Sequence, residues 1–140
     1  MINPILILGA VTYLTFTPSV VKYDSNQEHI IINQYDVELT AWEERLGKCE
    51  SGNNPLAINK YDGGSSSNGY HQYKFNTWNG DIKKYNLPFT EEDIWLKEAQ
   101  MEVTKTVIKN EPKGYLRWTN CTTNPSTPNY AGLPPLKAQI

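Results

Sequence analysis

Apolar residues recur at helical spacing just before the middle of the chain. The stripe consists of Leu39, Trp42, Leu46 and Cys49, at offsets of 0, 3, 7 and 10 residues. This spacing places all four side chains on one face of a helix. We expect the helix to run from Val37 to Glu50 with Asp36 as its N-cap, and the Gly- and Pro-containing residues 51–55 to end it. The pattern predicts the first core helix of a folded domain.

A change in composition follows this helix. Residues 57–73 are rich in Asn, Tyr, Gly and Ser, and Asp62-Gly63-Gly64 has the chemistry of a tight turn. With Gly69 to Tyr73 as a short extended piece, this stretch predicts a small hairpin or an irregular loop. Phe75 to Tyr85 is then expected to form a short helix around Trp78.

A second long helix is expected in the C-terminal half. Thr90 to Asp93 has the spacing of a capping box, and the apolar residues that follow cover a broad arc as far as Lys109. Residues 111–114 contain Pro and Gly and should stop this helix. The Pro-rich residues 122–140 lack periodicity, which predicts an extended or docked tail. Together these elements predict a mainly helical α+β fold.

The N-terminus carries an apolar run without a charged residue, from Ile5 to Val21. Its length is at the short end of what spans a bilayer. Residues 1–22 are therefore predicted to be a signal peptide or a membrane anchor, with a buried N-terminal helix as the alternative. Residues 23–35 are then predicted to be a linker that leads to a domain of residues 36–121. We expect the protein to be exported, either secreted or held at a membrane of the cell envelope.

Composition limits the remaining possibilities. A chain of 140 residues with 39% hydrophobic residues can bury one modest core. The net charge of -2 is spread without long like-charge runs, so nucleic acid is not expected as a partner. The two histidines lie far apart, and no HExxH or CxxC spacing occurs, so a catalytic metal is not expected either.

The chain has two cysteines, Cys49 and Cys121. An even number of cysteines in an exported chain predicts one disulfide, with two buried free thiols as the alternative. Closing a loop of roughly seventy residues would stabilise the fold by about 4 kcal/mol in the chain-entropy model.

The last residue of the first predicted helix is a candidate catalytic group. Glu50 falls within roughly 20° of Leu39 on the helical wheel, inside the apolar stripe. Desolvation there would raise the pKa of the carboxyl, and a proton held near neutral pH is what the acid catalyst of glycoside cleavage needs. Glu43 also falls near the edge of the stripe, so the wheel does not single out Glu50. An ordinary surface glutamate at a helix end is the alternative.

Sequence motifs around this glutamate resemble those of the lysozyme-like muralytic enzymes, both soluble lytic transglycosylases and resuscitation-promoting factors. Residues 49–53, Cys-Glu-Ser-Gly-Asn, are similar to the C-E-S-G-G-N of the resuscitation-promoting group. Residues 50–59 are similar to the transglycosylase pattern E-S-G-x-N-P-x-A-x-N. Residues 62–65 and 69–72 resemble the glycine-rich loop and the G-L-x-Q element of the same families.

Two further elements extend the resemblance toward the C-terminus. Gln72 and Trp78 keep the spacing of Q-F-x-x-x-T-W, including Thr77. Trp118-x-x-Cys121 resembles the W-P-x-C that ends the resuscitation-promoting domain. The match therefore covers roughly residues 37–121.

The resemblance implies a lysozyme-like domain with a small hairpin beside the catalytic helix. It implies that Glu50 is the general acid and base, that Gln72 contacts the sugar, and that Cys49 and Cys121 form the disulfide. The implied reaction is cleavage of the β-1,4 bond between N-acetylmuramic acid and N-acetylglucosamine in peptidoglycan, without a cofactor. Tyr70 and Tyr73 replace the family's Leu and Phe, and Asn53 replaces its second glycine, so the details of the sugar subsites differ.

Other side chains near the motif have two interpretations each. The four tryptophans are expected in the core, with a sugar platform as the alternative. Tyr61, Tyr70 and Tyr73 are either core residues or platforms for sugar faces. His71 is expected to be a plain polar loop residue, with a catalytic residue as the alternative. Asp62 is either a turn residue or the second carboxylate of a hydrolase.

The role of Asp62 decides the expected product. If Asp62 serves only the turn, the 6-hydroxyl of the substrate captures the cation and a 1,6-anhydro sugar results; a catalytic Asp62 predicts hydrolysis. The alternative to an enzyme is a non-catalytic peptidoglycan-binding protein, or a structural protein of a virion or envelope. Cleavage of chitin instead of peptidoglycan is a further alternative.

Overall fold

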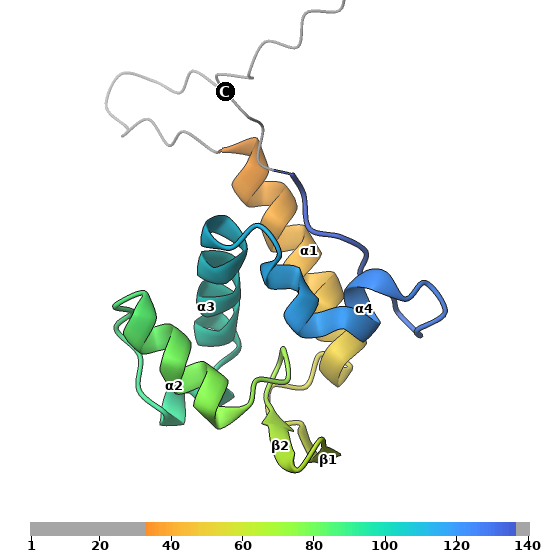
Figure 1. The fold of residues 1–140 in the computed structure, drawn as a ribbon. Helices are drawn as coiled ribbons and strands as arrows, with labels where there is room; N and C mark the ends of the chain where they lie inside the picture. Colours follow the sequence, from red (N-terminus) through yellow and green to blue (C-terminus); the bar gives the residue numbers. More distant parts are fainter. Residues whose placement is uncertain (1–32, 137–140) are drawn as a thin grey trace, which may run out of the picture. The chain divides into compact units, whose positions relative to one another are not determined.

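The structure is a computed structural model that describes residues 33–136 (Figure 1). Its helices are α1 (Gln34–Ser51), α2 (Phe75–Lys84), α3 (Lys97–Asn110) and α4 (Thr119–Thr123), its strands are β1 (Ile58–Asp62) and β2 (Ser65–Asn68), and its 3-10 helices are η1 (Glu92–Trp95) and η2 (Gly114–Trp118). The prediction of a mainly helical α+β fold with one hairpin is thus confirmed. The predicted signal or anchor segment, residues 1–22, lies outside the described residues, as does most of the predicted linker.

Helix α1 begins earlier than the sequence predicted. The side chain of Asn33 is the N-cap, because its Oδ1 accepts a hydrogen bond from the backbone N–H of Tyr35 at 3.0 Å. The expectation of Asp36 as N-cap is therefore wrong. Asp36 lies instead in the first turn, where its charge suits the helix dipole and pairs with Lys109 on α3. At the other end, Gly52 adopts the left-handed conformation, with φ of 64°, and ends the helix as expected.

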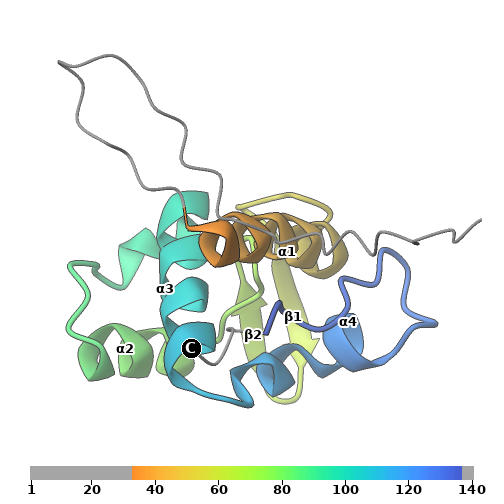
Figure 2. The same cartoon turned by 90° about the horizontal axis from the view of Figure 1, so that it is seen from above.

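The apolar stripe of α1 is the centre of the core. Leu39, Trp42 and Leu46 are fully buried, and α1 packs against α3 and α4 (Figures 1 and 2). The tail after α4 is docked on the same helix, since the indole Nε1 of Trp42 donates to the carbonyl of Gly132 at 2.8 Å. None of the helices in residues 33–136 combines the length and the apolar character that a membrane crossing requires.

The predicted hairpin is present. Strands β1 and β2 pair antiparallel, with Asn59 opposite Ser67 and Asp62 opposite Ser65. Gly63 and Gly64 make the turn, and both have positive φ, which two-residue hairpin turns favour. Figure 1 shows the hairpin near the C-terminal end of α1.

The segment after β2 differs from the expectation. Gly69 and Gln72 have φ of 79° and 56°, and the N–H of Gln72 donates back to the carbonyl of Gly69. Residues 69–73 therefore form a turn and not an extended piece. The turn results from the left-handed backbone at Gly69 and Gln72. It directs the Tyr70 side chain toward α1 and the Tyr73 side chain toward α3.

The second long helix is divided. Asp93 Oδ2 accepts from the N–H and the hydroxyl of Thr90, but the expected capping box is wrong, because η1 has Glu91 as its N-cap and no side-chain cap hydrogen bond. The chain then forms only η1, breaks at extended Leu96, and begins α3 at Lys97. The break allows Ile94 to reach the core, where it is fully buried. The short helix predicted around Trp78 is α2, and Trp78 is fully buried too.

Candidate active site

A polar cleft of about 400 Å³ lies where α1, the hairpin and the C-terminal part of the chain meet. Its lining consists of Cys49, Glu50, Asn59, Asp62, Ser67, Gln72, Arg117, Trp118, Thr119, Asn120, Cys121 and Thr127. Segments distant in sequence therefore build one site. Of the residues predicted to act on or contact the sugar, the structure brings three to it, namely Glu50, Asp62 and Gln72.

Glu50 is the half-buried acid of the cleft. It lies one residue before the end of α1, and burial raises the pKa of its carboxyl to about 7, with a further contribution from the negative charge of Asp62. Within the described residues, its carboxyl oxygens make no hydrogen bond and no ion pair. A carboxyl that is still protonated in part at neutral pH can donate a proton to a leaving-group oxygen and take one back.

Asp62 lies at the end of β1 and faces the same cleft. The Ser67 hydroxyl donates a hydrogen bond to Asp62 Oδ2, and Lys74 Nζ lies 3.8 Å from the same oxygen. Lys74 Nζ also donates to the backbone carbonyl of Asp62 at 3.1 Å. Asp62 therefore fastens the hairpin and places a negative charge in the cleft at the same time.

Gln72 presents an acceptor to the cleft. Its amide nitrogen donates to the carbonyls of Gly69 at 2.9 Å and Ala57 at 3.3 Å, which fixes the orientation of the side chain. Its Oε1 accepts no hydrogen bond from any residue between 33 and 136. A carbonyl oxygen in this position can accept a hydrogen bond from a hydroxyl or an acetamido N–H of a sugar.

Tyr70 and Tyr73 do not reach the cleft. Their exposed fractions are 1% and 3%, so neither ring can stack on a sugar. The interpretation of Tyr70 and Tyr73 as substrate-binding platforms is therefore wrong, and both are core residues. Tyr70 packs against α1 at Gly47, where an added Cβ would lie 2.1 Å from the Tyr70 ring. Tyr73 packs edge-on against Trp78 and Trp118. Both rings fill the core because the turn of residues 69–73 directs them inward.

The wall contributed by the C-terminal part of the chain was not predicted. It is formed by Arg117, Trp118, Thr119, Asn120 and Thr127. A usable signal was present in the sequence, because a bridge from Cys49 to Cys121 brings the residues beside Cys121 close to Glu50. Trp118 is a core residue, as expected, although one edge of it borders the cleft.

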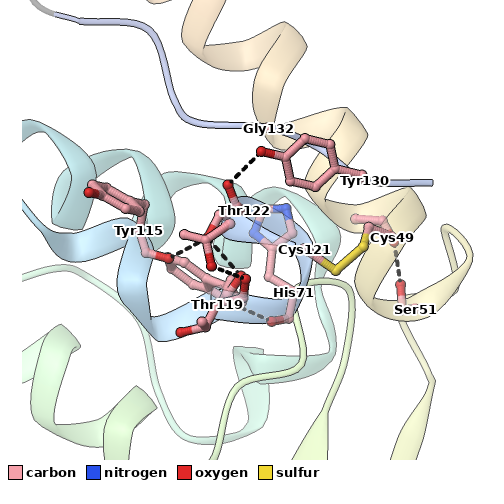
Figure 3. The surroundings of a disulfide bond; sticks show 12 residues. Cys49, Ser51, His71, Tyr115, Thr119, Cys121, Thr122, Tyr130 and Gly132 are labelled. Atoms are coloured by element: carbon pink, nitrogen blue, oxygen red, sulfur yellow. Dashed lines mark hydrogen bonds between the residues drawn. A yellow bond between two sulfur atoms is a disulfide. The ribbon is translucent and has the colours of Figure 1, made fainter. Parts of the chain in front are cut away.

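The disulfide between Cys49 and Cys121 is confirmed, with 5.9 Å between the two Cα atoms. Figure 3 shows it joining the end of α1 to α4. Nearby, the Tyr130 hydroxyl donates to the carbonyl of Thr122 at 3.0 Å (Figure 3), and the N–H of Ala131 donates to the carbonyl of Cys121 at 2.9 Å. The bridge and the docked tail thus hold the C-terminal wall of the cleft beside Glu50.

The other acid of the α1 stripe, Glu43, has a different environment. It is fully buried in the core and does not line the cleft. Neither carboxyl oxygen has a hydrogen-bond partner among the described residues, and Lys105 Nζ lies 4.0 Å from Oε2. Burial raises the pKa of Glu43 to about 8. The structure therefore separates the two glutamates that the helical wheel could not distinguish.

Replacing Glu43 with glutamine should stabilise the fold increasingly as the pH rises. The folded-state pKa of about 8 exceeds the ordinary value of 4.5, so the folded state binds more protons than the unfolded state between these values. Wild-type stability is therefore lost as the pH rises through this window, and the advantage of Glu43→Gln should reach about 3 kcal/mol at pH 7. Urea unfolding at pH 5, 7 and 9 measures the difference. A pH-independent difference between wild type and Glu43→Gln would contradict the prediction.

Among residues 33–136, no three His, Cys, Asp or Glu side chains gather closely enough to hold a metal ion. Comparisons with protein-family models, with curated proteins and with solved structures found no match. The features of this chain that bear on function are therefore the cleft and the sequence motifs that line it.

Proposed function

We propose that this protein cleaves the glycan strands of peptidoglycan at the β-1,4 bond between N-acetylmuramic acid and N-acetylglucosamine, through a lysozyme-like domain. The observation that carries the proposal is the half-buried carboxyl of Glu50, whose pKa is raised to about 7, in a polar cleft. The motifs around Glu50 and Gln72 supply the substrate class, because they resemble those of muralytic enzymes. The cleft adds hydroxyl and amide groups that suit a sugar chain.

The proposed reaction begins with proton transfer from Glu50 to the glycosidic oxygen. The bond between this oxygen and C1 of N-acetylmuramic acid breaks, and the electron pair leaves with the oxygen. The 6-hydroxyl of the same sugar then attacks C1 and returns its proton to the Glu50 carboxylate. The products are a new hydroxyl end and a 1,6-anhydro sugar, without consumption of water.

The contacts of Asp62 favour this intramolecular route over hydrolysis. Its Oδ2 is engaged by the Ser67 hydroxyl and lies near the Lys74 ammonium, which reduces its ability to stabilise a sugar cation. Asp62 then acts mainly through its charge, by raising the pKa of Glu50.

Mass spectrometry of the products from purified peptidoglycan tests the proposal. We expect anhydro products, which are lighter by one water than hydrolytic ones. Products with reducing-end N-acetylmuramic acid would indicate a hydrolase, and release from chitin alone would indicate a different substrate. Binding without any release would favour the alternative of a non-catalytic peptidoglycan-binding or structural protein of an envelope or virion.

The N-terminal apolar segment fits this function. An apolar run of this length would hold the domain at a membrane or direct its export, and either brings it to the wall polymer. Location in the cell envelope or in a virion, and contact with a membrane, remain predictions from residues 1–22.

Asp62→Asn should move the alkaline limb of the pH–rate profile to lower pH. The negative charge of Asp62 is one of the two causes of the raised pKa of Glu50, so its removal lowers that pKa, and Glu50 loses its proton at a lower pH. At pH 5, where Glu50 stays protonated, the rate should change little. The full pH dependence of the initial rate checks this. A large loss of rate at every pH, together with hydrolytic products from wild type, would contradict it.

A further inference from the structure

All four polar groups of His71 are hydrogen-bonded, each to a different residue. Its backbone N–H donates to Gln100 Oε1 at 2.6 Å, and its carbonyl accepts from the Trp118 indole at 2.8 Å. Its ring nitrogen Nδ1 lies 2.8 Å from Thr104 Oγ1, and Nε2 lies 3.0 Å from the carbonyl of Glu43. The side chain is fully buried, so these bonds link α1, α3 and η2 through one residue.

The direction of the ring hydrogen bonds follows from their partners. The Glu43 carbonyl can only accept, so Nε2 carries the hydrogen. Burial lowers the pKa of His71 to about 4, so the ring is neutral near pH 7 and Nδ1 is an acceptor. The Thr104 hydroxyl therefore donates to Nδ1, which leaves its oxygen to accept from the Tyr73 hydroxyl at 3.0 Å. Nε2 is thus a hydrogen-bond donor and Nδ1 is a hydrogen-bond acceptor.

His71 stands between two parts of the cleft. It directly precedes Gln72 in the turn of residues 69–73, and its ring binds the carbonyl of Glu43, seven residues or about two turns before Glu50 on the same helix. Its carbonyl also holds the indole of Trp118, which borders the cleft. Hydrogen bonds of His71 therefore connect the turn that carries Gln72 with the helix that carries Glu50.

We propose that His71 is a positioning residue that fixes Gln72 relative to Glu50 across the cleft. The inference rests on the proposed function, because it assigns to Gln72 the role of holding the sugar over Glu50. An apolar side chain would fill the same volume in the core without constraining the turn. A displacement of about 1 Å in a substrate contact can cost about 10²-fold in rate.

Kinetics of His71→Phe and His71→Gln test the role. His71→Phe keeps a ring of similar size but removes both nitrogens, and we expect it to lower kcat/KM by at least about tenfold. His71→Gln can still donate an N–H to the Glu43 carbonyl and should restore most of this loss. In a Gln72→Ala background, His71→Phe should cost little more, because the residue through which it acts is absent.

Val107→Ala is the matched control, since Val107 is a fully buried residue of α3 outside the cleft and its truncation lowers stability. At a temperature where all variants are folded, it should leave kcat/KM unchanged. If His71→Phe does not fold, His71→Gln is compared with the shorter His71→Asn. Equal activity of these two, or the same loss from His71→Phe with and without Gln72, overturns the proposal.

Hydrogen exchange of the Gln72 side-chain amide, followed by NMR, gives a readout that needs no activity. This amide is held by the carbonyls of Gly69 and Ala57 and should exchange faster in His71→Phe but not in Val107→Ala. Unchanged exchange in His71→Phe overturns the positioning role. An inactive wild type with faster exchange in His71→Phe contradicts the proposed function while supporting the connection between His71 and Gln72.

Discussion

Glu50→Gln is expected to abolish peptidoglycan cleavage while leaving the fold and glycan binding nearly unchanged. The amide fills the same volume in the cleft but cannot donate or accept the proton that the reaction moves. Removing a general acid or base typically costs about 10² to 10⁴ in rate. Because the carboxyl makes no hydrogen bond or ion pair within residues 33–136, its replacement should break no contact that holds the domain.

Rates of turbidity loss on purified peptidoglycan, together with binding of the same material in a sedimentation assay, measure this prediction. Glu38→Gln is the control, since Glu38 is an exposed residue of the same helix. Unchanged cleavage by Glu50→Gln would mean that Glu50 is an ordinary helix-end residue. Loss of both cleavage and binding would point to a structural role.

Removal of the disulfide, by Cys49→Ser with Cys121→Ser, should lower the free energy of unfolding by about 4 kcal/mol. The bridge closes a loop with a sequence separation of 72 residues, which restricts the unfolded chain. This loss is large against a total stability of about 5 to 15 kcal/mol. Activity should also fall, because Cys49 precedes Glu50 directly and Cys121 also lines the cleft.

Urea unfolding of the double variant and of wild type, with and without reductant, checks the effect. The reduced wild type should match the double variant, and addition of reductant should not change the unfolding of the double variant. Equal unfolding midpoints for oxidised and reduced wild type would contradict the prediction.

Local patterns predicted much of the fold, because short-range physics decides those features. The apolar stripe of α1 predicted the burial of Leu39, Trp42 and Leu46. The segment Asp62-Gly63-Gly64 predicted the hairpin turn. The start of α1 could not be decided locally, since Asn33 and Asp36 are both good N-cap residues. The break at Leu96 accompanies the burial of Ile94, a tertiary contact that local sequence patterns do not report.

The candidate site was predictable only in part. The stripe and the motif indicated Glu50, and the count of cysteines indicated the bridge. The direction of Tyr70 and Tyr73 depends on a turn with positive φ and on space at Gly47, which apolar periodicity does not report. The C-terminal wall comes from residues about seventy positions away, so only the bridge connected it to Glu50.

The bridge between Cys49 and Cys121 also bears on proteolysis. The exposed turn at Gly63 and Gly64 lies within the loop that the bridge closes. A protease that cuts the chain once at this turn produces two fragments that remain covalently joined, with Glu50 on one and Gln72 on the other. The nicked protein should migrate as one band on a non-reducing gel and as two bands after reduction.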